Sequence, residues 1–174
     1  MDKIFQLDSD ESIQETIVQT KRLALSAFQN YDLDWTQIRF NQLSDTATFV
    51  IETSNDGTFL LRIHSEMKKE AIDSELAWLE ALNDRLDTPV PIGVLDRNGS
   101  RSVTIDQGTG HNAHVSLMRW VEGEHKSGGL TEDEIIKEGI LLAKLHSVAQ
   151  NFELPSGFER PEWGSKALYK QRQG

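Results

Sequence analysis

The 174-residue sequence contains no cysteine, and this absence excludes several kinds of chemistry at once. Disulfide bridges, metal sites built from thiolates and a cysteine nucleophile are all ruled out. Clusters of positive charge are missing too: the longest basic runs are the pairs Lys21-Arg22 and Lys68-Lys69, and the formal net charge is −10. A nucleic-acid partner or an anionic membrane surface would need a denser basic patch, so neither is expected.

Long hydrophobic runs are also absent. No segment approaches the ~20 consecutive apolar residues that a membrane-spanning helix requires. Near the N-terminus the acidic residues Asp8, Asp10 and Glu11 stand where a signal peptide would have its apolar segment. We therefore expect a cytoplasmic protein with one domain of ordinary size, or slightly more than one.

Alternation of apolar and polar residues predicts a sheet that is mostly antiparallel. Asp56-Gly57 separates two alternating segments, and Asp-Gly is the strongest short-range signal for a hairpin. The predicted strands are 35–43, 46–53, 58–64, 92–95, 102–106 and 113–121. Glycines also mark residues 108–110, but no helix follows them, so a hairpin turn is favoured over a dinucleotide-binding site.

Three segments with apolar residues at helical spacing predict helices, of which the first two are expected to flank this sheet. They cover residues 10–28, 66–86 and 131–149. Ser9 or Asp10 is the expected N-cap of the first helix and Ser65 that of the second. Thr131 and Glu134 have the spacing of a capping box at the start of the third. Together with the sheet, these helices predict the α+β fold class.

Arg62 is the most informative charged residue of the predicted strands. Its neighbours Leu61 and Ile63 are apolar, so its guanidinium is expected to enter a partly desolvated place, where a permanent cation needs an anion. Glu75, on the helix that follows, is the natural partner. Nucleotide kinases use a strand cation held by a helix carboxylate to aim a charge at ATP phosphates. An exposed strand arginine with no such role is the alternative.

Other candidate sites have less support. His111 and His114 have a spacing that metal ligands can have, but no third ligand lies near them, so ordinary loop and strand histidines are favoured. Ser44 and Ser65 lack a histidine and an acid in a context that would activate a nucleophile. No catalytic and no metal-binding residue is assigned from the sequence.

Five short segments follow one another in a characteristic order and at characteristic intervals. They are Phe59-Leu60-Leu61-Arg62-Ile63-His64, Glu75-Leu76-Ala77-Trp78-Leu79, Val90-Pro91-Ile92, Leu117-Met118-Arg119-Trp120-Val121-Glu122-Gly123 and Leu142-Ala143-Lys144-Leu145-His146. As a series they resemble the N-terminal portion of the aminoglycoside phosphotransferase and choline kinase superfamily, small-molecule kinases with the protein-kinase-like fold. The resemblance implies a kinase-like N-lobe at residues 1–122. Residues 123–174 would form a hinge linker and the first part of a truncated C-lobe, including its first helix.

By this resemblance, Arg62 is the strand cation that faces the phosphates of ATP, and Glu75 is the helix acid that holds it. The implied hinge, whose backbone meets the adenine edge, consists of Met118, Arg119, Trp120 and Val121. Ser44 lies in the loop 43–47, which would cover the phosphates. This loop departs from the family pattern because it has no glycine, and Asp45 would repel phosphate unless a cation intervenes. The implied cofactors are ATP and Mg2+.

The second half of the family pattern has no counterpart in this sequence. Neither a His-x-Asp catalytic loop nor a later metal-binding acid is found after Gly123. The ligands of Mg2+ are therefore expected in the missing C-lobe. The sequence predicts the N-terminal part of an ATP-dependent small-molecule phosphotransferase, inactive as this fragment, whose substrate is a hydroxyl compound resembling an aminoglycoside or an amino alcohol. A non-catalytic nucleotide-binding or protein-interaction module is the alternative.

The predicted helix 131–149 carries apolar residues around more than one face. Contiguous apolar patches larger than a few hundred Å2 seldom stay exposed on soluble monomers. We therefore expect a two-fold homodimer in which this helix packs against its copy or is exchanged between the chains. The alternative is that Phe152, Phe158 and Trp163 fold back and cover the helix within one chain.

Overall fold

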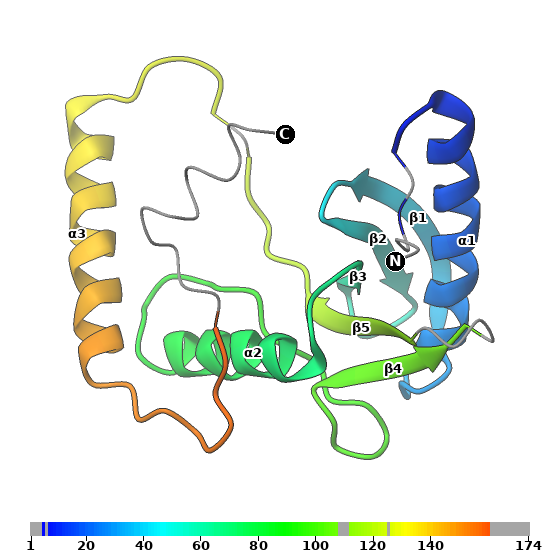
Figure 1. The fold of residues 1–174 in the computed structure, drawn as a ribbon. Coiled ribbons are helices and arrows are strands. Elements are labelled where there is room, and N and C mark those ends of the chain that lie inside the picture. Colours follow the sequence, from blue (N-terminus) through cyan, green and yellow to red (C-terminus); the bar gives the residue numbers. More distant parts are fainter. Residues whose placement is uncertain (1–4, 6, 108–111, 125, 161–174) are drawn as a thin grey trace.

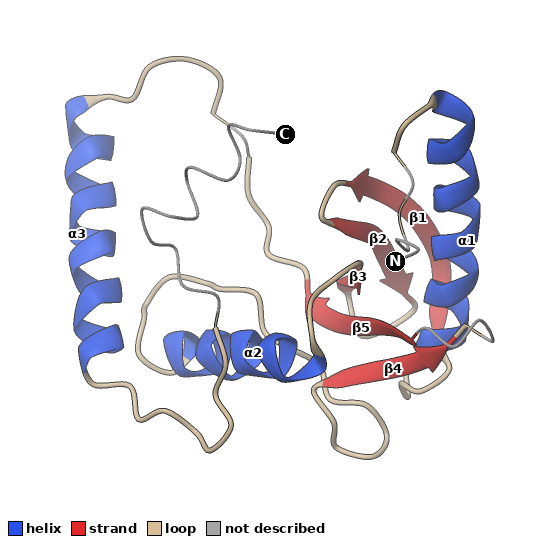
Figure 2. Ribbon diagram, viewed as in Figure 1, coloured by secondary structure: helices blue, strands red, loops and turns tan. Residues whose placement is uncertain are grey.

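The structure is a computed structural model, and it describes residues 5, 7–107, 112–124 and 126–160 (Figure 1). In chain order its elements are α1 (Asp10–Phe28), β1 (Trp35–Leu43), β2 (Thr46–Thr53), β3 (Thr58–His64), α2 (Lys69–Asn83), β4 (Ser102–Asp106), β5 (Asn112–Arg119) and α3 (Glu132–Gln150). Figure 2 shows the strands gathered in one sheet, with the helices outside it. The predicted α+β class is confirmed.

The five strands of the described residues form one sheet in the order β1-β2-β3-β5-β4. Each pair of neighbours is antiparallel. Gly57 has φ 88° in the turn between β2 and β3, a conformation that glycine adopts without the steric cost of a side chain. The hairpin predicted from Asp56-Gly57 is therefore present. β3, which carries Arg62, is the central strand, as expected.

The two faces of the sheet are covered by different helices. On the α1 face, side chains of the helix and of the central strands make the larger core, where each buried large apolar side chain contributes about 2 kcal/mol. The principal members are Leu23, Ala24, Ala27, Phe28, Phe49, Ile51, Phe59, Leu61 and Ile63. A smaller cluster on the opposite face joins Ile72 and Leu76 of α2 to Met118 of β5. Because side chains alternate along a strand, Arg62 points to the α2 face.

Two of the predicted helix starts are correct. Ser9 caps α1, where its hydroxyl accepts the backbone N–H of Ser12. At the start of α3, Thr131 and Glu134 form the expected capping box. Both helices therefore begin where a side chain satisfies an otherwise unpaired N–H.

The second helix is shorter than predicted and begins later. α2 starts at Lys69, with Lys68 as an N-cap whose side chain makes no capping hydrogen bond, and it ends at Asn83. Ser65 does not cap it, since the helix begins four residues after Ser65, and the Ser65 hydroxyl instead donates to the carbonyl oxygen of Asp45 at 3.0 Å. That contact ties the end of β3 to the turn between β1 and β2.

The predicted strand at 92–95 is reduced to one isolated bridge, between Gly93 and Met118. A Cβ at Gly93 would lie 3.1 Å from Leu76 Cδ2, so this glycine lets the segment approach α2 closely. The last strand also stops short of the predicted Val121, since β5 ends at Arg119. Residues 108–111 and Trp163, which the sequence analysis considered, lie outside the described residues.

α3 lies beside α2 and apart from α1 in Figure 1. Val148 is its one buried residue, and Ile135, Ile136, Ile140 and Leu142 are 53–57% exposed. Residues 151–160, the described part of the chain after α3, do not cover these four side chains. Phe152 and Phe158 turn back instead to α2, where Phe152 packs edge-on against Trp78 with ring centres 4.9 Å apart. No helix among the described residues is long and apolar enough to cross a membrane.

Candidate functional site

Arg62 and Glu75 form the ion pair that the sequence predicted. Nη1 of Arg62, on β3, donates to Oε1 of Glu75, on α2, at 2.5 Å. The two side chains are only 19% and 18% exposed, so the pair is largely shielded from water. Met118 flanks it, with its sulfur 3.7 Å from the same arginine nitrogen. The alternative of an exposed strand arginine is therefore wrong.

The second oxygen of Glu75 faces another cation. Arg160, from the segment that follows α3, places Nη1 3.4 Å from Oε2. Burial of Glu75 acts to raise its pKa, but the hydrogen bond and charge of Arg62, with the charges of Arg160 and His64, outweigh it. The pKa therefore lies below its ordinary value, and the carboxylate stays ionised at neutral pH.

One pocket brings together most of the predicted site residues. The hinge pocket, with a volume of about 370 Å3, is lined by Leu60, Arg62, Glu75, Leu79, Pro91, Met118, Arg119, Trp120 and Val121. Its walls are mainly apolar, and the Arg62–Glu75 pair is its charged part. A mostly apolar pocket with a few fixed polar groups is the usual form of a small-molecule site.

Most backbone N–H groups at the end of β5 already donate to other backbone carbonyls. The N–H of Arg119 donates to the carbonyl of Ile92 at 2.8 Å, and the N–H of Trp120 donates to that of Thr58 at 3.0 Å. The guanidinium of Arg119 lies over the ring of Phe59. Within the described part of the chain, the N–H of Val121 makes no backbone hydrogen bond, which leaves it as the donor beside the pocket.

Ser44 lies in a second pocket that also includes Arg62. The loop pocket, of about 770 Å3, is lined by Phe5, Leu7, Ser44, Asp45, Thr46, Arg62, His64, Ser65, Glu66 and Met67. Arg62 therefore stands between the two pockets, with the turn after β1 on one side and the end of β5 on the other. Asp45 and Glu66 add negative charge to the loop pocket. Among the described residues that line it, Arg62 is the one cationic side chain.

His64 is a site residue that the sequence analysis did not single out. It is only 2% exposed, and its Nε2 lies 3.0 Å from the hydroxyl of Ser116. Burial, followed by the charge of Arg62, lowers the pKa of His64 to about 4. Its ring is therefore neutral at neutral pH. Its place two residues after Arg62 on the same face was the available signal.

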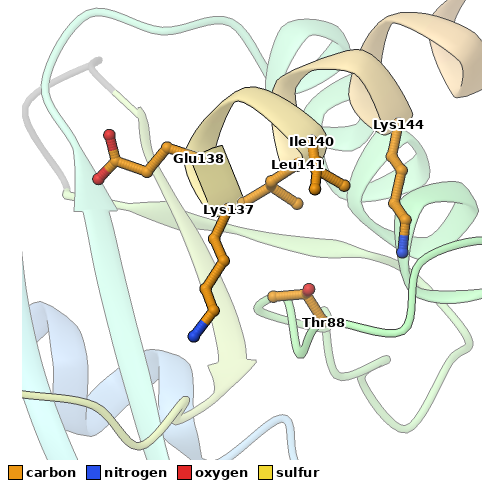
Figure 3. Close-up of a pocket in the computed structure, with 6 residues that line it drawn as sticks. All are labelled: Thr88, Lys137, Glu138, Ile140, Leu141 and Lys144. Carbon is orange, nitrogen blue, oxygen red and sulfur yellow. The ribbon is translucent and has the colours of Figure 1, made fainter. Parts of the chain in front are cut away.

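Figure 3 shows a third pocket, between α3 and the chain after α2. It has a volume of about 360 Å3 and is lined by Thr88, Lys137, Glu138, Ile140, Leu141 and Lys144. None of the predicted site residues lies there. Among the described residues, no group of three or more histidine or acidic side chains is placed to hold a metal ion.

A family model describes most of this sequence. The model of the phosphotransferase enzyme family matches residues 36–173. The chain belongs to that family. No curated protein matches the chain.

Two solved structures give the extent of the similarity to known proteins. A microcompartment-associated aminopropanol kinase is 32% identical, with a TM-score of 0.66, and the match covers 84% of this chain and 45% of that one. An amicoumacin kinase, solved in complex with AMP-PNP, Ca2+ and Ami, is 14% identical, with a TM-score of 0.73, and the match covers 94% of this chain and 50% of that one. The chain thus spans about half the length of both kinases. The predicted kinase-like N-lobe followed by a helix is confirmed as the fold.

Proposed function

We propose that this phosphotransferase chain is the nucleotide-binding part of an ATP-dependent small-molecule kinase. Its N-lobe would be residues 1–122, and residues 123–174 would begin the second lobe. The acceptor would be a hydroxyl of a small compound resembling an amino alcohol or an aminoglycoside. The observation that carries the proposal is the largely shielded Arg62–Glu75 pair, which lines a pocket together with the predicted hinge residues. A cytoplasmic location stays a prediction from the sequence.

The residues of the hinge pocket fit an adenine nucleotide. Leu60, Leu79 and Met118 offer apolar contacts to a flat aromatic base, and Val121 offers its backbone N–H at the edge of the pocket. The guanidinium of Arg62 is the donor that would meet a phosphate oxygen, because arginine matches phosphate geometry with several N–H groups. Bound ATP would supply the phosphoryl group.

Glu75 has a positioning role in this proposal. Its charge holds Arg62 in one orientation, so the guanidinium need not be ordered when nucleotide arrives. Ser44 lines the loop pocket together with Arg62 and would contact the phosphates from the turn after β1. Asp45 and Glu66, on the same pocket, would repel phosphate in the absence of a divalent cation.

Magnesium ligands are not assigned to the described residues, which hold no suitable group of three. We place these ligands, and the base that would accept the substrate proton, in the other half of the family fold. The 174-residue chain by itself is accordingly expected to transfer no phosphate. An assay with ATP, magnesium and a panel of hydroxylated amines tests this. Turnover that survives purification to homogeneity would mean that the chemistry has been misplaced.

Nucleotide binding itself is tested by calorimetric titration of the chain with AMP-PNP, ATP and AMP in magnesium buffer. We expect saturable binding of AMP-PNP that ATP displaces, and weaker binding of AMP, which lacks the phosphates that Arg62 would contact. Equal affinity for all three would remove the role proposed for Arg62. No binding of any of them would favour the alternative, a protein-interaction module.

We also propose that the chain forms a two-fold dimer through α3. The support is the exposure of Ile135, Ile136, Ile140 and Leu142, which the returning segment leaves uncovered. Such a surface gains free energy when a second apolar surface covers it.

A further inference from the structure

The segment that follows α3, orange in Figure 1, returns to the helix that carries Glu75. Aromatic stacking fixes its beginning, where Phe152 contacts Trp78 of α2 and lies 5.4 Å from Phe158. Gly157, with φ 77°, forms the turn that precedes Phe158. The segment is thus folded against α2 before it reaches the site.

Polar contacts then align the end of this segment with one turn of α2. The N–H of Glu159 donates to the hydroxyl of the buried Ser74 at 2.9 Å. The carboxylate of Glu159 pairs with Lys68 at 3.2 Å. Because Ser74 directly precedes Glu75, these contacts place the next residue, Arg160, beside Oε2 of Glu75, the oxygen that Arg62 does not contact.

Glu75 is therefore held at both oxygens by different parts of the chain. Arg62 pairs with Oε1, and Arg160 pairs with Oε2. A carboxylate bound on one side alone can turn about its last side-chain bond, because that torsion is broad. Two arginines on opposite oxygens restrict this rotation.

We propose that Arg160 is a positioning residue of the nucleotide site, which holds Glu75 so that Glu75 in turn fixes the orientation of Arg62. This inference rests on the proposed function, and it makes the segment after α3 part of the site. Arg160 acts through Glu75 and not by contact with the phosphates. Removing Arg160 should therefore weaken nucleotide binding only while Glu75 is present.

Arg101 provides a matched control for Arg160. It also pairs with a carboxylate of α2, Glu80 at 2.7 Å, and its side chain is 42% exposed against 41% for Arg160. Arg101 lines neither the hinge pocket nor the loop pocket. Replacing either arginine with glutamine removes one ion pair from α2, but only Arg160→Gln affects Glu75.

The first test does not depend on nucleotide. The pKa of Glu75 is measured by NMR titration of its side-chain carboxyl carbon, assigned from the signal that disappears in Glu75→Gln. Arg160→Gln should raise this pKa, because the charge of Arg160 lowers it, and Arg101→Gln should leave it unchanged. Arg160→Lys, which keeps the charge, should restore most of the shift. An unchanged pKa in Arg160→Gln would overturn the proposal.

The second test is a double-mutant cycle on AMP-PNP affinity. Arg160→Gln should weaken binding severalfold in the wild-type background and have no further effect in the Glu75→Gln background. Equal losses in both backgrounds would show that Arg160 contacts the nucleotide directly, which contradicts a positioning role. If the wild-type chain binds no nucleotide, the proposed function fails, and a raised Glu75 pKa in Arg160→Gln would still establish the contact that positions Glu75.

Discussion

Nη1 of Arg62, on β3, lies 2.5 Å from Oε1 of Glu75, on α2, and the arginine lines two pockets. The central strand and the helix that covers it are thus joined by one charged contact. Desolvation of both groups offsets much of their attraction, so the intact pair need not add much stability. The geometry of the pair instead fixes a cation between the turn after β1 and the end of β5.

We predict that substitutions of Arg62 and Glu75 have non-additive effects on the free energy of unfolding. Arg62→Gln leaves Glu75 as a shielded carboxylate that only Arg160 partly compensates, so unfolding should become easier by about 1–3 kcal/mol. Arg62→Gln combined with Glu75→Gln should recover much of this loss, because no unpaired charge remains. Urea unfolding of the single and double variants measures the effect. Strictly additive losses would contradict the coupling.

His64 should make stability depend on pH. Its pKa is about 4 when folded and 6.5 when unfolded, so the unfolded chain binds more protons between these values. The stability present above pH 6.5 is lost as the pH falls toward 4, by about 2 kcal/mol at pH 5. Urea unfolding at pH 7.5 and 5 should show this loss in the wild type.

The variant His64→Gln should lose less stability over the same pH range, because glutamine does not titrate and can still bond Ser116. The groups that set the folded pKa remain in the variant, since Arg62, Glu75 and His114 are unchanged. His146→Gln, at an exposed position of α3, is the control. Identical pH profiles for the wild type and His64→Gln would refute this account of the buried ring.

Two glycine-to-alanine substitutions should change the stability of the protein in opposite directions. Gly93→Ala places a methyl group 3.1 Å from the buried Leu76, so it should destabilise the protein by about 1 kcal/mol or more and displace α2. The new methyl group of Gly139→Ala would meet no atom within 4 Å apart from its chain neighbours and the backbone of its own helix, so this substitution should stabilise α3 by up to about 1 kcal/mol. Thermal unfolding of both variants is the measurement. A stabilising Gly93→Ala would mean that Leu76 moves freely.

The exposed face of α3 should cause self-association. Sedimentation equilibrium of the wild-type chain is expected to show a dimer, and Leu142→Glu should shift the equilibrium to monomer because it places a charge within the apolar surface. Gln150→Glu, at the last residue of α3, introduces the same charge as a control. A strictly monomeric wild type would reject the dimer.

Sequence patterns predicted the elements well where local physical rules decide the structure. The Asp56-Gly57 hairpin and the Thr131 capping box are local features, and both were found. The start of α2 was missed because its N-cap, Lys68, makes no side-chain capping bond that a sequence pattern would show, while Ser65 contacts the distant Asp45. Likewise, the segment around Gly93 pairs with β5 through too few hydrogen bonds to form a strand.

Only part of the candidate site could be predicted, again because local patterns do not show contacts between distant segments. Arg62 and Glu75 could be paired from the sequence, because an arginine between apolar strand residues needs an anion and the next helix offers one. Arg160 could not, since it follows an irregular segment whose path depends on the stacking of Phe152 against Trp78. His64 was overlooked, although its place two residues after Arg62 on the strand put both side chains on the same face of the sheet.

The central claim, that Arg62 faces the phosphates of a nucleotide, is tested most directly by comparing two ligands with two variants. Arg62→Gln should weaken AMP-PNP binding roughly tenfold or more, the usual loss when a charge-assisted hydrogen bond is removed, and leave adenosine binding unchanged. Arg39→Gln, on the exposed part of β1, is the control and should change neither affinity. Equal effects of Arg62→Gln on AMP-PNP and adenosine, or no effect on either, would contradict the account.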